Sequence, residues 1–129
     1  MERLRDGSAF EAVASYSRAA RSGPFIAVSG TAALAESGQP LHPGDTYGQT
    51  KVALERALAA AGKLGAAASD VLRTRMFFAP SADWRDGIRA HQEIFEGVDP
   101  ANTTLFVAGF PVDGALVEVE LEAWVETGD

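Results

Sequence analysis

Three glutamates alternate with apolar residues near the end of the chain, in the segment Leu116–Ala123. Successive side chains of a β-strand point to opposite faces, so Glu118, Glu120 and Glu122 are predicted to share one face. Three like charges on one strand repel one another, which is unusual if that strand is central in a sheet. One interpretation is that at least one of these carboxyl groups lies in a binding site between subunits, with a raised pKa suited to proton transfer.

The same pattern has a simpler interpretation, in which the glutamates form a solvated or salt-bridged face. Arg73 and Arg75 lie two residues apart in the segment Asp70–Phe78, which is also predicted to be a strand, and their charges could neutralise the glutamates. Because ion-pair networks also perturb carboxyl groups, the spacing alone favours this simpler interpretation. The sequence leaves both open.

Other residues give weaker chemical signals. His91 lies at helical spacing with apolar residues, where a histidine is usually part of the core. The only other histidine, His42, is distant in a Pro/Gly loop, so no metal site is expected. Ser29, Gly30 and Thr31 follow a short apolar run and could present hydroxyl and backbone N–H groups to a ligand, or simply form a turn.

These residues must be positioned by a small set of predicted elements. The apolar run Phe25–Val28 is predicted to be a strand buried on both faces, and the periodicity predicts a helix over 46–64. A second helix is predicted from Ser81 or Asp83 to Glu96. Its side chains Trp84, Ile88, His91 and Phe95 fall on one stripe, which is expected to be buried. The remaining predicted strands are 70–78, 103–108 and 116–125, with a weak hairpin over 16–29.

The order of these elements predicts an α/β (α+β) domain with two layers. Two strand–helix–strand crossovers favour a mixed sheet with both helices on one face. The other face then has no cover within the chain, although apolar residues such as Phe25 and Leu105 must be placed somewhere. An open apolar face of this kind is usually buried against another subunit, so an oligomer is expected.

Composition limits the possible functions. The chain has 129 residues, a net charge of −7 and no cysteine, which predicts a single domain over 1–129 without thiol or disulfide chemistry. Its charged opening is unlike a signal peptide, and no apolar run approaches the roughly 18 residues of a membrane span. We therefore expect a cytoplasmic protein without a membrane partner. An acidic surface repels phosphate backbones, so nucleic acid is not an expected partner either.

Several segments, taken in order and spacing, resemble the RidA/YjgF family. The resemblance covers nearly the whole chain, and although each segment is short, the ordered set is fairly specific. The segments are 16–19, 25–30, 45–50, 60–62, 70–74, Phe95, 100–101 and 111–120.

The resemblance implies a chorismate-mutase-like fold and a homotrimer with sites in the clefts between subunits. The best-known members of this family hydrolyse reactive enamines and imines to 2-oxo acids and ammonia, and they need no cofactor. By this resemblance Tyr16 corresponds to a tyrosine of the cleft, and Ser29 and Gly30 correspond to its Ser-Gly pair. Glu118 corresponds to the glutamate that positions water, with Glu120 as the alternative if the alignment shifts by two residues. Thr104 corresponds to a side chain that lines the cleft.

The chain also departs from the family pattern. Asn102 stands where the family arginine grips the substrate carboxylate, and losing such a charged contact costs roughly 2–4 kcal/mol. Ile88 and His91 replace the usual asparagine and aromatic residue of the second helix. Arg75 is a hypothetical substitute as the anion partner, if it faces the cleft.

These observations lead to two functional hypotheses. The first is a cofactor-independent enzyme that acts on a small imine, enamine or related metabolite, with Glu118 as the acid/base or water-positioning group. Ser29, Gly30, Thr31, Asn102 and Thr104 would then orient the substrate. The second is a non-catalytic trimer of the same family that binds a metabolite or a protein. RNA cleavage is a third and less favoured option, because the chain is acidic and has no basic patch.

Overall fold

The computed structural model describes residues 1–126. The elements follow one another along the chain as β1 (Glu2–Leu4), α1 (Ala9–Ala14), β2 (Ala19–Ser22), β3 (Phe25–Thr31), α2 (Thr46–Lys63), the 3-10 turn η1 (Ala68–Asp70), β4 (Val71–Phe78), α3 (Trp84–Phe95), β5 (Ala101–Phe106) and β6 (Val117–Trp124).

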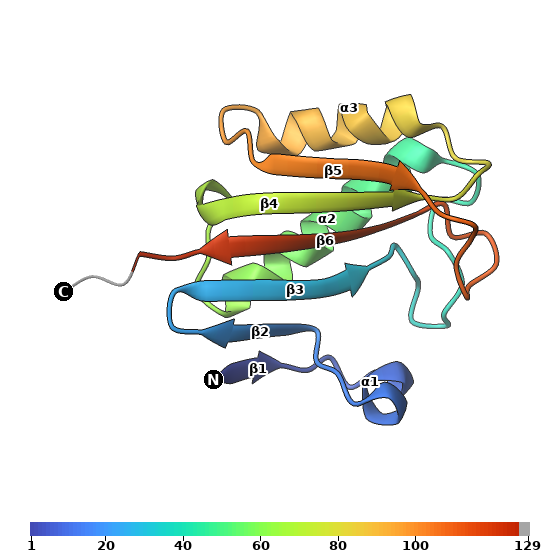
Figure 1. Ribbon diagram of the computed structural model, residues 1–129. Coiled ribbons are helices and arrows are strands. Elements are labelled where there is room, and N and C mark those ends of the chain that lie inside the picture. Colours follow the sequence, from blue (N-terminus) through green and yellow to red (C-terminus); the bar gives the residue numbers. More distant parts are fainter. Residues whose placement is uncertain (127–129) are drawn as a thin grey trace.

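The six strands form one mixed sheet in the order β1-β2-β3-β6-β4-β5 (Figure 1). Only β4 and β5 pair in parallel, and α3 makes the crossover between them. The last strand, β6, inserts between β3 and β4 and pairs antiparallel with both. The carboxylate strand is therefore central in the sheet, with neighbours on both sides.

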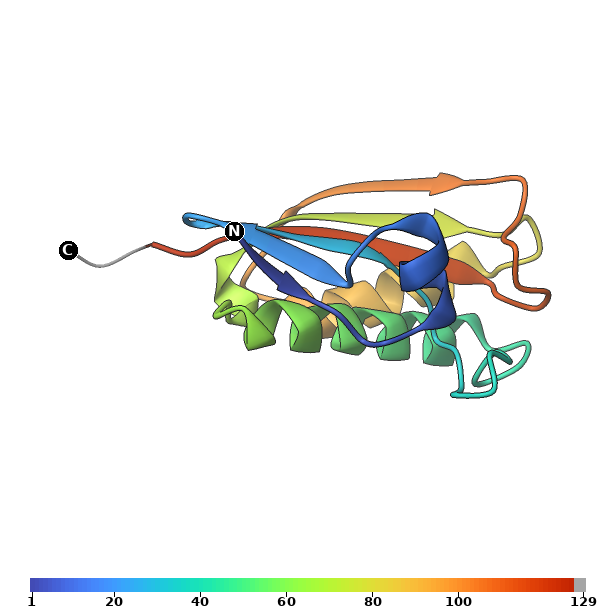
Figure 2. The same cartoon turned by 90° about the horizontal axis from the view of Figure 1, so that it is seen from below.

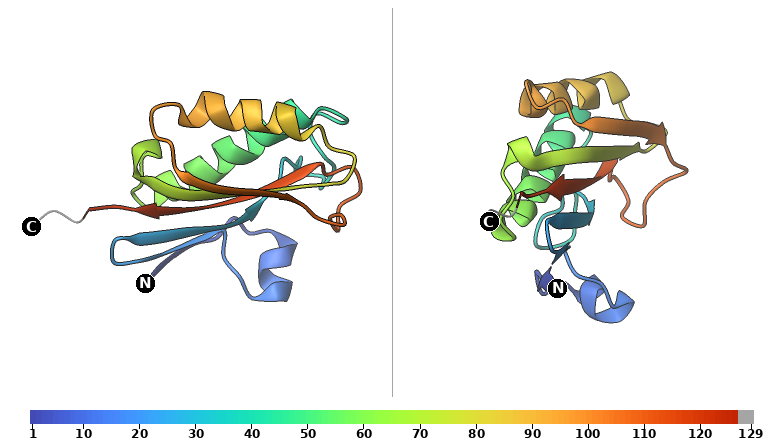
Figure 3. Two further views of the ribbon diagram at one scale, coloured as in Figure 1. Left: turned by 45° about the horizontal axis from the view of Figure 1, so that its top comes forward. Right: turned by 60° about the vertical axis from the view of Figure 1, so that its left-hand side comes forward.

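Both long helices cover the same face of the sheet (Figure 2). The predicted two-layer α+β fold with two helices on one face is confirmed. The opposite face, which we call the open face, carries no helix layer. The short helix α1 lies beside the β1–β2 end of the sheet (Figure 3), and neither α1 nor β1 was predicted. A helix of six residues is too short to show a 3.6-residue period.

The core lies between α2 and the sheet. Helix α2 turns a row of small residues toward the strands, which lets the helix approach closely, and its larger Leu54 is fully buried. The largest buried side chains of the strands are Ile26, Met76, Phe78, Val117, Val119 and Leu121. These residues fix the face on which each neighbouring polar side chain must point, because strand side chains alternate.

The prediction that Phe25–Val28 is buried on both faces is wrong for this chain. Ile26 and Val28 are buried under α2, whereas Phe25 is 38% exposed on the open face. Phe25 lies directly opposite Trp124 of β6, which is also exposed on that face. The apolar run carries no alternation because both of its faces are apolar, although only one of them is covered by the chain itself.

The prediction of a single buried stripe on α3 is also wrong. Trp84 and Ile88 are 41% and 36% exposed, His91 is partly buried, and only Phe95 of the predicted stripe is fully buried. The residues that face the sheet are Gly87, Ala90 and Phe95. Since Gly87 and Ala90 are small, α3 approaches Phe78 closely, and the larger residues are left on the flank of the helix.

Candidate active site

The alternation along β6 is as predicted. Its apolar residues Val117, Val119 and Leu121 are at most 1% exposed under α2, and the glutamates between them point to the open face. The open face of the central strand therefore carries a row of carboxyl groups. The positions of basic side chains around this row decide whether it is a salt-bridged surface or a chemical site.

Two of the glutamates are neutralised by one arginine of β4. Arg75 donates from Nη1 to Glu122 at 2.7 Å and to Glu120 at 3.3 Å. Arg73, on the same face, donates instead to the hydroxyl of Thr103. The simpler, salt-bridged interpretation thus holds for Glu120 and Glu122. It also occupies Arg75, the residue considered as an anion partner.

Glu118 is different from the other two glutamates. Within residues 1–126, no basic side chain lies within 4.0 Å of its carboxylate oxygens. Burial raises the pKa of Glu118; Arg18 lowers it and the nearby Glu120 charge raises it, leaving a raised pKa overall. A half-buried carboxyl group with a raised pKa is a candidate for general acid–base chemistry.

The position of Glu118 depends on the missing side chain of Gly30. A Cβ at Gly30 would collide with Oε1 of Glu118 and lie 3.0 Å from its Cδ. The carboxyl group therefore lies directly against the backbone of β3. The pairing of β3 with β6 is irregular at this point, since Val28 pairs with Leu121 but Thr31 pairs with Val119. Ser29 and Gly30 thus face a single residue of β6, and bulges of this kind often re-aim side chains at functional sites.

The bulge is held by short hydrogen bonds from the neighbouring hydroxyl groups. Ser29 donates from Oγ to the carbonyl of Ser17 at 2.7 Å, and Thr31 donates from Oγ1 to the carbonyl of Ser29 at 2.8 Å. Thr31 is buried and pairs with Val119, so its side chain stays on the helix side, away from Glu118. These hydroxyls fix the backbone around Gly30, and the two bonds above use their protons.

Arg18 is a residue of this site that the sequence analysis missed. It donates from Nη2 to the carbonyl of Gly30 at 2.6 Å and acts on the charge of Glu118. Its guanidinium lies 6.0 Å from the centre of the Tyr16 ring, so Tyr16 is placed at the same end of the sheet. Its only signal in the sequence was its place in the segment Tyr16–Ala19, in which Tyr16 was the residue expected to line the cleft.

Asn102, Thr104 and His91 form a second polar cluster, joined through Thr74. His91 Nε2 lies 2.7 Å from the hydroxyl of Thr74, and Asn102 donates to that hydroxyl at 3.0 Å. Thr104 donates to the side-chain carbonyl of Asn102 at 2.7 Å. Burial lowers the pKa of His91, so the whole cluster is neutral near pH 7.

The second cluster lies on the other side of the sheet from Glu118. Asn102 and Thr104 pair with Thr74 and Met76 of β4, and Thr74 and Met76 are buried on the helix side. Glu118 instead faces the open side. Within one chain the structure therefore brings Glu118 together with Gly30, Arg18 and Ser29, and it keeps Asn102, Thr104 and His91 apart from them.

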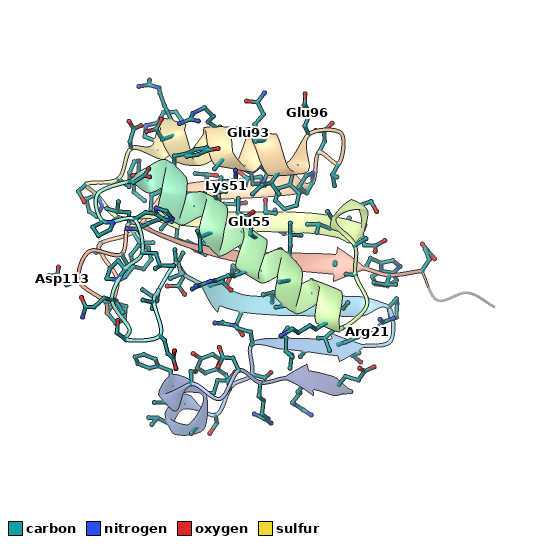
Figure 4. The ribbon with its side chains drawn as sticks, turned by 180° about the vertical axis from the view of Figure 1, so that it is seen from behind. Arg21, Lys51, Glu55, Glu93, Glu96 and Asp113 are labelled. Carbon is teal, nitrogen blue, oxygen red and sulfur yellow. The ribbon has the colours of Figure 1, made fainter. Side chains whose placement is uncertain are left out.

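A surface hollow of about 330 Å³ adjoins the second cluster at the end of α3. His91, Phe95 and Pro100 line it, together with the polar side chains Gln92, Glu96 and Asp99. Figure 4 shows Glu93 and Glu96 projecting from α3 on the helix side of the molecule. Within the described part of the chain, no three His, Asp or Glu side chains are grouped so that they could hold a metal ion.

Comparison with known proteins shows the family of this chain. The sequence model of the family described as Endoribonuclease L-PSP matches residues 6–125. The chain belongs to this family, also known as the RidA/YjgF family. An uncharacterised protein of Streptomyces coelicolor is 39% identical over 125 residues, which cover 96% of this chain and 92% of that protein.

Solved structures show the same fold. A Mycobacterium tuberculosis member of the YjgF/YER057c/UK114 family is 34% identical, with a TM-score of 0.85 and coverage of 96% of this chain and 98% of that one. Escherichia coli TdcF, solved with bound serine, is 18% identical, with a TM-score of 0.78 and coverage of 98% and 96%. Within residues 1–126, no helix has the length and apolar character needed to cross a membrane.

Proposed function

We propose that this RidA/YjgF protein is a cofactor-independent enzyme that hydrolyses a small reactive imine or enamine, with Glu118 as its acid/base. The observation that carries the proposal is the state of Glu118, a half-buried carboxyl group with a raised pKa and no ion-pair partner within residues 1–126. An imine is activated when its nitrogen is protonated, and the same group can then take a proton from the attacking water. The products are a carbonyl compound and ammonia.

The proposed site is completed by a second subunit. Phe25, Trp124 and Leu105 are exposed on the open face around the charged row, so that face has apolar surface available for an interface. We propose a homotrimer in which the open faces meet and Glu118 lies in the resulting clefts. Burial in such a cleft would raise the pKa of Glu118 further. Sedimentation of a monomer near 14 kDa at micromolar concentration would contradict this assembly.

A second candidate function is a non-catalytic trimer that binds a metabolite or a protein. The observation that favours it is the state of Asn102, whose side chain is neutral and is held by Thr74 and Thr104 on the helix side. The chain thus keeps the fold while lacking a charged group at that position. TdcF is a relative whose structure contains a bound serine, which supports a small molecule as the ligand in either case.

The family description also includes the word endoribonuclease, and the chain offers little support for that activity. Its net charge is −7, and cleavage of RNA requires favourable contact with a phosphate backbone. A ribonuclease activity of this protein would fall as the salt concentration rises, and its presence in Glu118→Gln would show that it is unrelated to the site proposed above.

The proposal is tested by ammonia release from enzymatically generated 2-iminopropionate. Wild type, Glu118→Gln and Asn102→Arg are assayed side by side, with circular dichroism to verify that each variant is folded. We expect activity in the wild type and a loss of at least about 100-fold in Glu118→Gln, the scale of general acid–base catalysis. Activity only in Asn102→Arg would mean that the scaffold is competent for another substrate. Inactivity of all folded variants would favour the binding protein.

A further inference from the structure

We propose that Arg18 is the anion-binding residue of the Glu118 site. The proposal rests on the function proposed above in one respect, because it takes the open face around Glu118 as the place where a ligand binds. It adds the residue that selects the ligand and the ligand's chemistry: a small molecule that carries an anionic group next to the atom that reacts with Glu118.

The first argument is that the hydrogen-bonding capacity of Arg18 is largely unused. A guanidinium has five N–H donors, and the described partner of Arg18 is a single backbone carbonyl, that of Gly30. Its Nε is buried and donates to nothing in the described residues. Buried donors are nearly always paired, so an orphaned N–H on a charged side chain marks a place where an acceptor is missing.

The second argument is that Arg18 forms no ion pair with a carboxylate of the described residues. None lies within 4.0 Å of it, although Glu118 and Asp6 are close enough to interact with its charge. Asp6 accepts the backbone N–H of Ser8 at 2.8 Å, and Glu118 lies against Gly30. A partly buried cation without a counter-ion is costly, and an incoming anion would relieve that cost.

Two other arginines have more partners among the described residues. Arg75, on the same open face, contacts two carboxylates. Arg21 donates to the carbonyls of Leu64 and Gly23 at 2.6 and 2.8 Å, and it lies at the C-terminal end of α2 in Figure 4, where the helix dipole favours a cation. Arg18 differs from the arginines of β4 because its Nε is buried without an acceptor in the described residues and its Nη2 reaches the carbonyl of Gly30, beside Glu118.

The arrangement of Arg18 and Glu118 also limits the ligand. Both groups adjoin Gly30, which places a hydrogen-bond donor with a positive charge beside a carboxyl group whose pKa burial raises. A ligand with an anionic group bound to Arg18 would present its neighbouring C=N or C=O group to Glu118.

The test measures anion preference by titrating ¹⁵N-labelled protein with pyruvate and, separately, with pyruvamide, its neutral analogue of the same shape. The amide signals of Ser29 and Gly30 locate the binding. We expect the wild type to bind pyruvate at least about tenfold more tightly than pyruvamide, the scale of one charge-assisted contact. Arg18→Gln should lose this preference, and Arg18→Lys should retain part of it.

Arg21→Gln is the control, because it removes the same charge from nearby β2, at a residue that pairs with the buried Ile26 and donates to carbonyl groups away from Glu118. We expect it to keep the wild-type preference for pyruvate. The proposal is overturned if a folded Arg18→Gln keeps the preference, if Arg21→Gln loses it equally, or if the wild type shows no preference at all.

The outcome is separable from that of the proposed function. Binding of pyruvate is measured without turnover, so a charge preference that depends on Arg18 would stand even if ammonia release were absent. Conversely, imine hydrolysis that depends on Glu118 but shows no effect of Arg18→Gln on KM would preserve the enzyme and remove Arg18 from substrate binding.

Discussion

At both Gly30 on β3 and Gly87 on α3, another side chain occupies the space that a Cβ would take. The two side chains are of different kinds. The space at Gly30 holds the carboxyl group of Glu118, on the open face. The space at Gly87 holds the ring of Phe78, which is fully buried on the helix face. One glycine allows a titratable group to rest against a backbone, and the other allows a helix to approach a sheet.

The difference shows how the two faces of one sheet divide their roles. On the helix face, polar groups such as those of Thr74 and His91 are neutral and bonded to each other. On the open face, Arg75 is neutralised by carboxylates, and Glu118 and Arg18 remain without an ion-pair partner among the described residues. Stability is thus carried by the helix face, and the groups able to react with a ligand are left on the open face.

Among the substitutions that test this comparison, Gly30→Ala is expected to have the largest effect, and that effect is on activity. The backbone at Gly30 lies outside the left-handed region, so alanine can adopt it, but its Cβ would displace the carboxyl group of Glu118. Misplacement of a catalytic group by about 1 Å can cost ~100-fold in rate, and we expect a loss of roughly 10- to 100-fold in ammonia release.

A double-mutant cycle separates displacement of Glu118 from damage to the fold. In the Glu118→Gln background, Gly30→Ala should have little further effect on the residual rate, because the displaced group is already inactive. Equal losses in both backgrounds would mean that Gly30 acts independently of Glu118. The thermal midpoint of each variant shows whether the fold is kept.

The next largest effect is on stability, from Gly87→Ala. The added Cβ would lie 2.5 Å from Cε1 of Phe78, a rigid ring in the core, so the helix must move away from the sheet. Overpacking of this kind costs about 1–3 kcal/mol, which urea unfolding can measure. Gly62→Ala on α2 is the control, since nothing lies within 4 Å of its Cβ, and we expect it to stabilise by up to ~1 kcal/mol. Equal effects of the two substitutions would show that Gly87 has no special role in packing.

Much of the fold was predictable because the strongest periodicities survive in the structure. The alternation of β6 and the length of α2 depend on local sequence alone. The pairing of β3 with β6 could not be read in the same way, because those strands are far apart in the chain. The bulge at Ser29–Gly30 depends on that pairing, and so does the contact between Gly30 and Glu118.

The site was predicted in part for a similar reason. The row of glutamates was visible in the sequence, but its division between Glu118 and the Arg75 pair is decided by the register of β4 against β6. Arg18 gave almost no signal in the sequence, because its hydrogen bond joins it to a carbonyl twelve residues away. Its buried Nε without a partner is visible only in the structure. The side chain of Asn102 lies on the helix face because Asn102 pairs with Thr74, and a linear motif does not encode that pairing.

A smaller effect is expected from Arg75→Gln on the open face. Its ion pairs with Glu122 and Glu120 are roughly a third exposed, and water and salt weaken such pairs. We expect a decrease in thermal midpoint smaller than that of Gly87→Ala, and it should shrink further at high salt because the uncompensated glutamates are then screened. A loss as large as that of Gly87→Ala, independent of salt, would mean that the open face contributes to stability as the helix face does.

The smallest effect is the pH dependence contributed by His91. Because burial lowers its pKa below the ordinary 6.5, protons bind the unfolded chain more readily than the folded one. Its contribution to stability is therefore complete above pH 6.5 and declines as the pH falls below that value. His91→Gln, which keeps a polar group beside Thr74, should lose less stability than the wild type between pH 8 and pH 5. If His91→Gln followed the wild type, the neutral cluster of the helix face would have no part in the response of the fold to acid.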